Sequence, residues 1–354
     1  MSILDRYIIR SVIGSTLLVL FVLLILYSLF IFIDQQQDIG VGRYTALSAL
    51  YFTLLNIPQV AFEMLPIAAL IGSLLGLGGL AHGSEVTVIR ATGISVARIA
   101  GTVLMAGILL IGAEVLLGEF LAPPLRQAAT QKKAFSKFND ISFGGSGAWV
   151  RDGNKILNVA RQSGERQFGG MVVFELSPDH RLLSVGRAGH ATAGNDRQWT
   201  LSDYAESRFT DDGVVAVPSS QRILETNVTA SFLGLAVDTP GELTSRALWS
   251  LIQYLQSNSL NTREYVFNFW SRIARTVAIA FAVLLAVPFI LGSFRSAGAG
   301  TRTMLGLVIG LAFFLLQRMI ESGTQLFDLN PVILAWVPTV LLATVTLLLL
   351  ARAR

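Results

Sequence analysis

The chain has 354 residues, of which 53% are hydrophobic and 14% are charged, and its mean hydropathy is +0.60. These values exclude a single water-soluble domain, because so much apolar surface has to be hidden from water. The formal net charge of +4 is small and the chain has no cysteine, so we expect neither a nucleic-acid partner nor disulfides.

Six apolar stretches are long enough to cross a bilayer. A hydrocarbon core of about 30 Å requires roughly 20 apolar residues in a helix. The second stretch contains Pro58 and Pro66, which remove backbone donors, so we expect a kinked or broken helix there. The six predicted spans cover residues 12–33, 47–81, 97–121, 277–291, 304–320 and 332–350.

The arginines predict the orientation of these spans. Both termini and the second and fourth connections carry Arg6, Arg10, Arg90, Arg98, Arg295, Arg302, Arg352 and Arg354. The short opposite loops carry Arg43 against Asp34, Asp38, Glu321 and Asp328. By the positive-inside rule, both termini are cytoplasmic and the long polar insert lies on the other side, in the periplasm.

The insert, residues 127–263, has the pattern of a β domain. Short apolar runs occur at 148–150, 156–159, 171–176 and 199–201, and turn residues such as Asp152-Gly153-Asn154 separate them. Regularly spaced strands of this kind favour a sandwich, jellyroll or barrel. We therefore predict an α-helical membrane protein with six transmembrane helices, three on each side of an inserted all-β, jellyroll-like domain.

The sequence contains few signs of catalytic chemistry. It lacks the Gly-x-x-x-x-Gly-Lys-Ser/Thr phosphate loop, so we expect no ATP binding by this chain. His82, His180 and His190 are scattered and have no cysteine or paired spacing around them, which gives no metal site. We expect neither a catalytic residue nor a cofactor here.

The connection after the second span, about residues 84–92, has the features of a short helix. Ser84 could cap it, Glu85 would lie in its first turn, and Gly93 could end it. Val86, Ile89 and Arg90 would share one face. Two interpretations stay open: a solvated connector that enforces topology, and a coupling helix that docks into a soluble motor domain.

Several short motifs, in order along the chain, resemble the YjgP/YjgQ family of lipopolysaccharide export permeases. They are LDRYI at 4–8, FIDQ at 32–35, LLGLGGLA at 74–81 with Ser84-Glu85 after it, GEFLAP at 118–123, NFWSRI at 268–273 and FILG at 289–292. No single motif is specific. Their order and their positions on the predicted topology carry the resemblance, which covers nearly the whole chain.

The resemblance implies an exporter in which this permease and a paralogous permease, LptF, sit on a dimer of the ATPase LptB, which binds ATP and Mg. Lipopolysaccharide would pass from the membrane into periplasmic jellyrolls that continue through LptC and LptA. Residues 1–126 and 264–354 would form the membrane part, and residues 127–263 the periplasmic domain. By direct motif match, Glu85 would belong to the ATPase-coupling helix, together with Val86, Ile89 and Arg90.

A lipid A site needs an apolar wall and cations for its phosphates. For the wall we select Leu26, Phe30, Phe313 and Phe314, and for the cations Arg126, Lys132, Lys133 and Arg318, while Arg272 and Arg275 also lie near outer helix ends. The same residues could instead be lipid-facing side chains and interfacial anchors. Relatives can carry lysines at the end of the first span, whereas residues 31–38 have none.

Two other classes of function remain open. An ion-coupled secondary transporter would use intramembrane charges such as Glu63, Glu114, Glu119 and Arg318. A membrane scaffold would transmit ATPase motion to the β domain without passing a substrate. Dependence of transport on a partner ATPase would separate the first alternative from an ABC permease, and a lipid crosslinked inside the helix bundle would argue against the second.

Overall fold

The computed structural model describes residues 2–138, 141–142, 148–162, 167–179, 181–194, 198–210, 213–226, 243–291, 299–323 and 329–352. The chain divides into two compact units. The first comprises Met1–Gln37, Thr53–Arg126 and Arg263–Arg354, and the second Asp38–Phe52 and Gln127–Thr262. Several residues used in the sequence analysis lie outside the described part, namely His180, Arg295, Asp328 and Arg354, as do the side chains of Arg302, Phe314 and Glu321.

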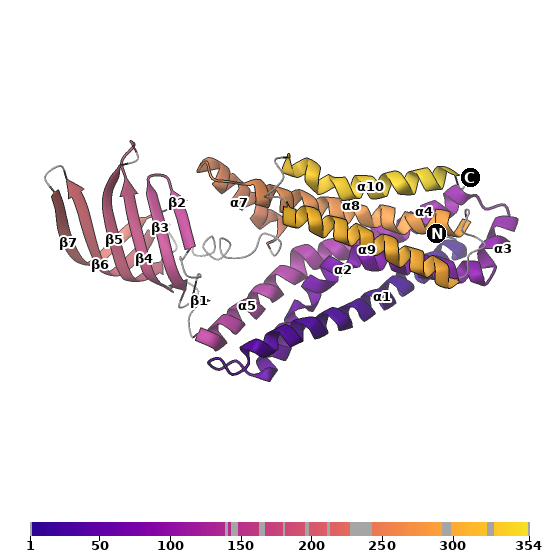
Figure 1. Ribbon diagram of the computed structural model, residues 1–354, viewed down its shortest axis with the longest axis horizontal. Coiled ribbons are helices and arrows are strands. Elements are labelled where there is room, and N and C mark those ends of the chain that lie inside the picture. The colour runs from indigo at the N-terminus through magenta and orange to yellow at the C-terminus, as the bar shows by residue number, and fades with distance from the viewer. Residues whose placement is uncertain are drawn as a thin grey trace. The chain divides into compact units, whose positions relative to one another are not determined.

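The first unit is a bundle of long apolar helices (Figure 1). Five helical stretches are long and apolar enough to cross a membrane, and a sixth helix contains the shorter apolar stretch Val308–Ile320. The predicted membrane fold is confirmed. The helices of the bundle are α1 (Ile3–Gln35), α2 (Ala46–His82), α3 (Glu85–Ala91), α4 (Val96–Leu116), α8 (Arg263–Leu291), α9 (Ala299–Gly323) and α10 (Pro331–Arg352).

Helix α2 runs without interruption through Pro58 and Pro66, so the predicted break does not occur. Most of α2 is buried, and this packing outweighs the backbone hydrogen bond that each proline removes. On α2, Gly72 and Gly76 form a small-xxx-small pair against α1: a Cβ at Gly72 would overlap the backbone of Thr16. The hydroxyl of Ser11 donates to the Gly76 carbonyl at 3.1 Å.

Helix α4 continues further than the sequence predicted. It passes through the π-helical turn η2 (Leu117–Leu121) into α5 (Ala122–Phe138), so residues 127–138 are helical and are not part of a β structure. Pro123 and Pro124 lie in the first turn of α5, where the fixed backbone angle of proline fits a helix. They therefore begin α5 and do not end the helical path.

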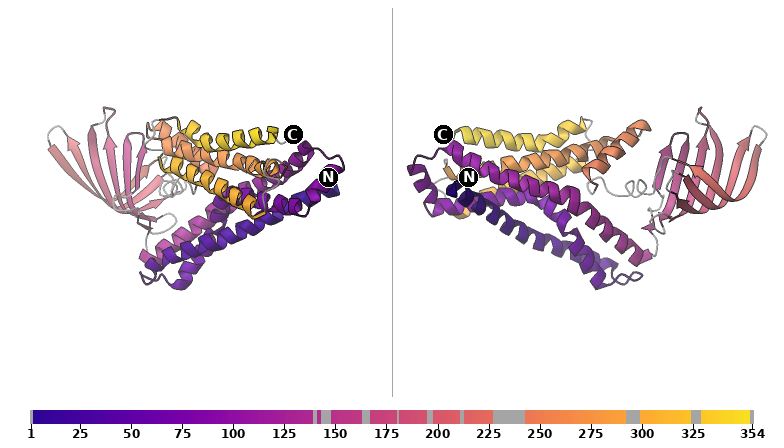
Figure 2. Two further views of the ribbon diagram at one scale, coloured as in Figure 1. Left: turned by 45° about the vertical axis from the view of Figure 1, so that its right-hand side comes forward. Right: turned by 180° about the vertical axis from the view of Figure 1, so that it is seen from behind.

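Helix α8 is largely buried within the bundle. It packs against α4 on one side and α10 on the other, and α10 lies beside it in both views of Figure 2. Its small residues Ala278, Ala282 and Ala286 are almost completely buried, which allows the close approach of its neighbours. The N-terminus, the C-terminal end of α10 and α3 lie at the same end of the bundle (Figure 1).

The second unit contains one antiparallel sheet of seven strands among its described residues. From β3 to β7 the strands pair in chain order, and β1 and β2 both pair with β3. The strands are β1 (Ile141–Ser142), β2 (Ala148–Asp152), β3 (Lys155–Gln162), β4 (Gln167–Leu176), β5 (Leu182–Ala193), β6 (Gln198–Thr210) and β7 (Gly213–Glu225). The inserted all-β domain is confirmed, and the four predicted strands lie within β2, β3, β4 and β6.

One face of the sheet carries the apolar core of this unit. Phe168 and Trp199 are almost completely buried, with ring centroids 4.9 Å apart. Helix α7 (Ser245–Ser257) was not predicted from the sequence, and its Tyr254 packs against this core and donates a hydrogen bond to the Arg151 carbonyl. Buried residues alternate with more exposed ones along much of β2, β5 and β6.

Candidate functional site

The short helix α3 begins and ends as the local sequence allows, with one exception. Gly93 has φ +87°, and its N–H donates to the Arg90 carbonyl at 3.0 Å, which ends the helix as predicted. Ser84, however, has φ +58° and makes no side-chain cap. The predicted cap is wrong because a side-chain cap requires an extended backbone at that position, which the tight α2–α3 turn does not permit.

The two faces of α3 differ. Val86 is buried and Ile89 is half-buried, and both pack against the apolar core of the bundle. Val88 and Arg90 are exposed, and Glu85 is half-buried. The predicted common face of Val86, Ile89 and Arg90 is therefore divided: the two apolar side chains hold α3 to the bundle, while the guanidinium stays accessible.

The first turn of α1 ties α3 and α4 together at this end of the bundle. The Tyr7 hydroxyl donates a hydrogen bond to Glu85 Oε2 at 2.7 Å. Asp5 forms a reciprocal capping box with Ser2 and also accepts a bond from Thr102 of α4 at 3.1 Å. The LDRYI motif thus has a structural role that the sequence alone did not disclose, since the partners lie far along the chain.

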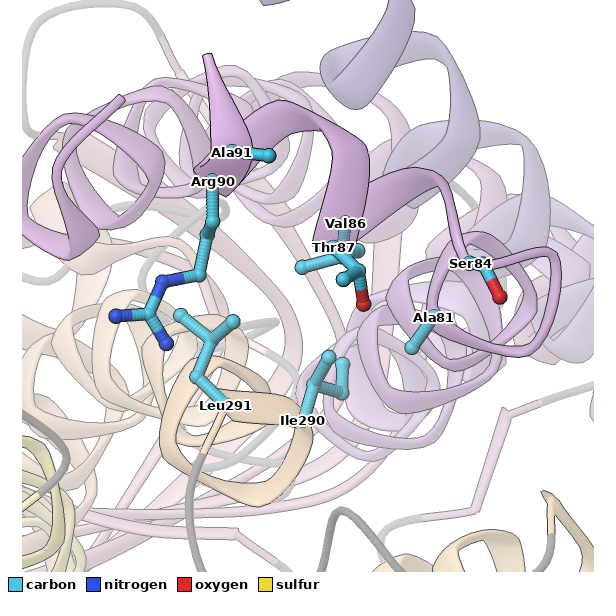
Figure 3. Close-up of a pocket in the computed structure, with 8 residues that line it drawn as sticks. All are labelled: Ala81, Ser84, Val86, Thr87, Arg90, Ala91, Ile290 and Leu291. Atoms are coloured by element: carbon cyan, nitrogen blue, oxygen red, sulfur yellow. The ribbon is translucent and has the colours of Figure 1, made fainter. Parts of the chain in front are cut away.

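A cavity of about 510 Å³ lies between α3 and the C-terminal end of α8. Its lining residues are Ala81, Ser84, Val86, Thr87, Arg90, Ala91, Ile290 and Leu291. Figure 3 shows Arg90 extending from α3 beside Leu291. The side chain of Arg90 forms no hydrogen bond or ion pair with any residue that the structure describes. The cavity combines an apolar floor with an accessible cation, which suits an acidic or amphipathic segment of another protein.

The predicted cations Lys132 and Lys133 both contact the start of α2, and Lys133 also contacts the connection between α1 and α2. Lys133 forms an ion pair with Asp38 at 2.8 Å and lies over the Phe52 ring at 4.9 Å. The ammonium group of Lys132 lies 3.8 Å from the centroid of the Tyr51 ring. Both side chains are therefore held in place, and Lys132 is the more exposed of the two.

The two predicted arginines lie in different surroundings. Arg126 is half-buried and donates to Asn56 Oδ1 of α2 at 3.1 Å. Arg318 is exposed on α9. Arg126 thus joins two helices, while Arg318 lies at the surface of α9.

The predicted apolar wall is only partly exposed. Leu26 and Phe30, four residues apart on α1, are 51% and 68% exposed in this chain by itself. Phe313 on α9 is half-buried and packs against the bundle core, and the side chain of Phe314 is outside the described residues. Leu26 and Phe30 therefore offer apolar contact surface, whereas Phe313 serves packing as well.

The long apolar helices, the inserted antiparallel sheet and the cavity beside a short terminal helix together define a polytopic membrane protein with an inserted β domain. The chain belongs to the family described as lipopolysaccharide export system permease LptF/LptG, whose model matches residues 6–352. The family expected from the motifs is thereby confirmed, and the chain is an inner-membrane protein.

Individual relatives agree. The chain is 32% identical over 361 residues to the lipopolysaccharide export system permease protein LptG of Escherichia coli (strain K12), covering 99% of this chain and 98% of that one. It is 28% identical to LptG of Haemophilus influenzae, covering 99% of each. Identity to LptF of E. coli K12 is 23%, covering 98% and 92%. The similarity is thus greater to LptG than to LptF.

Proposed function

We propose that this chain is the permease subunit of an ABC-type exporter that takes lipopolysaccharide from the outer leaflet of the inner membrane and passes it to periplasmic β domains. The observation that carries this proposal is the match to LptG over nearly the full length of both chains, the inserted sheet included. A relative that shared only the helices would support a membrane permease without a periplasmic path for the lipid.

Helix α3 is the proposed contact with the ATPase, a dimer of LptB that binds the ATP and Mg. Its Glu85, Val86, Ile89 and Arg90 would couple ATP hydrolysis to the bundle. Support comes from the division of its faces, since Val86 and Ile89 pack inward and Arg90 is exposed beside the cavity. A rigid helix held from inside can transmit a push applied from outside.

The proposed topology has both termini and α3 in the cytoplasm and the sheet in the periplasm. The arginine distribution supports it. The common location of both chain ends and α3 at one end of the bundle also fits, because an even number of spans returns the chain to its starting side (Figure 1).

The proposed lipid contacts are Leu26, Phe30, Phe313 and Phe314 for the acyl chains, and Arg126, Lys132, Lys133 and Arg318 for the phosphates. Leu26 and Phe30 are exposed enough to contribute directly. A phosphate approaching Lys133 would have to compete with Asp38, whereas the ammonium group of Lys132 lies over the Tyr51 ring. LptF would complete the membrane cavity, and LptC and LptA would receive the lipid.

The test is purification of the chain from membranes in mild detergent, followed by mass spectrometry of the proteins and lipids that accompany it. We expect a small ATPase, a second permease and lipopolysaccharide, and ATP-dependent lipid release from reconstituted vesicles. Transport by the chain alone under an ion gradient would overturn the proposal in favour of a secondary transporter. ATP hydrolysis with no lipid movement would favour the scaffold.

A further inference from the structure

The helical path from α4 to α5 contains two adjacent backbone carbonyls, those of Gly118 and Glu119, that the helix itself cannot satisfy, because Pro123 and Pro124 have no N–H. In η2 the Ala122 N–H bonds to the Leu117 carbonyl, five residues back. The next residue, Pro123, has no N–H. The donors four and five residues beyond Gly118 are therefore used or absent, which leaves the Gly118 carbonyl without an intrahelical partner.

Arg272 of α8 supplies the missing donor. Its Nη2 donates to the Gly118 carbonyl at 2.6 Å, and its Nε lies 3.5 Å from the carboxylate of Glu119. The guanidinium also lies 4.8 Å from the centroid of the Phe62 ring of α2. Arg272 is only 6% exposed. One side chain thus joins three helices at the point where the backbone pattern changes.

The neighbouring residues are matched to this contact. A Cβ at Gly118 would lie 2.5 Å from Phe62 Cε2, so only glycine allows the ring to approach here. Arg275, one turn further along α8, lies 5.3 Å from the same ring. Three parts of the chain, from the GEFLAP and NFWSRI motifs and from α2, meet at this place.

Two acidic residues lie close to the two arginines. Glu119 Oε1 lies 3.5 Å from Arg272 Nε, and Glu114 is fully buried on α4 near Arg275 and Arg272. A lipid phosphate at Arg272 would have to compete with Glu119 and the Gly118 carbonyl for the guanidinium.

We propose that Arg272 is a positioning residue that holds the π-helical turn of η2 and so sets the direction in which α5 leaves the membrane helices. Two consecutive prolines and a π turn make this the part of the α4–α5 path with the fewest intrahelical hydrogen bonds. The functional consequence rests on the proposed export function: motion of α4 reaches the chain beyond α5 only if this turn does not bend.

The experiment uses the full chain in lipid nanodiscs with its partner ATPase and second permease. Hydrogen–deuterium exchange measures the opening of residues 117–126, and a second assay measures lipopolysaccharide delivered per ATP hydrolysed. Arg272→Met should raise exchange at residues 117–126 about tenfold or more, because a charge-assisted bond to the backbone is lost. Exchange in α10 should stay unchanged, and delivery per ATP should fall several-fold.

Two further variants separate positioning from space filling. Arg275→Met also removes a guanidinium of α8 that lies beside the Phe62 ring, but this residue does not bond the Gly118 carbonyl. It should therefore leave exchange at residues 117–126 near the wild-type level. Pro123→Ala adds an N–H five residues beyond Gly118, so the double variant Arg272→Met with Pro123→Ala should recover protection and delivery. If Arg272→Met prevents assembly, Arg272→Lys with and without Pro123→Ala answers the same question.

Unchanged exchange in Arg272→Met would overturn the proposed contact. Raised exchange with undiminished delivery per ATP would overturn its positioning role. If the wild-type complex delivers no lipopolysaccharide, the proposed export function fails, while the exchange measurements still decide whether Arg272 holds the turn.

Discussion

Tyr7 and Glu85, 78 positions apart in the chain, are joined by a 2.7 Å hydrogen bond at the end of the bundle where α3 lies. The bond orients the carboxylate of Glu85 before any partner arrives. The carboxylate nevertheless remains partly exposed. A partner that offers a cation could therefore bind Glu85 without first unfolding α3.

We predict that Glu85→Ala weakens association with the ATPase about tenfold, because a charged contact at the interface is lost. The measurement is the amount of ATPase retained on the purified permease pair at increasing salt concentration. Tyr7→Phe is the matched variant, since it removes the hydrogen bond and keeps the carboxylate. Tyr7→Phe should weaken the association much less than Glu85→Ala does. An equal loss of association in both variants would show that the orientation of Glu85 by Tyr7 is what matters.

The two lysines of α5 should differ in their effect on lipid. Lys133 is paired with Asp38, whereas Lys132 contacts a ring face. Lys132→Ala should therefore reduce the lipopolysaccharide that copurifies several-fold, and Lys133→Ala should reduce it less. The double variant Asp38→Lys with Lys133→Asp keeps an ion pair at this place, so it should give a higher yield of the complex than Lys133→Asp alone. A larger loss for Lys133→Ala than for Lys132→Ala would contradict this ranking.

The contact between α1 and α2 depends on Gly72. Its added Cβ would overlap Thr16, so Gly72→Ala should destabilise the bundle by about 1–3 kcal/mol through overpacking. Thermal unfolding of the detergent-solubilised chain measures this. Gly78→Ala, on the same helix, is the control because no atom lies within 4 Å of its added Cβ. Equal melting temperatures for the two variants would argue against a close α1–α2 contact.

The sheet should lose stability in alkaline solution through Tyr204. Burial raises the pKa of the Tyr204 phenol, and the hydrogen bond from Arg222 at 2.6 Å partly opposes this. In the unfolded chain the phenol ionises near pH 10. The folded state therefore holds the proton more tightly, and its stabilisation is present below about pH 10 and is lost as the pH rises through the folded pKa.

Tyr204→Phe removes this titration, so its unfolding free energy should fall less steeply between about pH 9 and pH 11 than that of the wild type. Denaturant unfolding followed by far-ultraviolet circular dichroism at several pH values measures the slope. Tyr51→Phe, which removes a phenol outside the sheet, serves as the control. Parallel slopes in the wild type and Tyr204→Phe would contradict the assignment.

Much of the fold follows from local pattern. Uninterrupted apolar runs predict helices of membrane length, and α1, α2, α8 and α10 lie where those runs are. The turn at Gly153, with φ +59°, joins β2 to β3 where the turn residues indicated. Strands β5 and β7 and helix α7 were not predicted, because their apolar residues are diluted by polar ones that face outward.

The candidate site was predicted only in part. The motif and the helix start near Glu85 located α3, and Gly93 located its end. The cap at Ser84 was wrong, since the conformation of a tight turn depends on both helices that it connects. The continuation of α5 beyond residue 126 was missed, because Pro123 and Pro124 are compatible with either the end or the beginning of a helix.

The sequence by itself determined the membrane class, the inserted β domain and the family, because composition, apolar run length and residue order are properties of the chain alone. Only the tertiary structure decided which charges are satisfied. Arg272 at the Gly118 carbonyl, Lys133 at Asp38 and Tyr7 at Glu85 are each contacts between distant segments. Such contacts depend on helix packing, and a buried arginine that completes a backbone hydrogen bond has the same sequence signature as one that anchors a helix at the membrane surface.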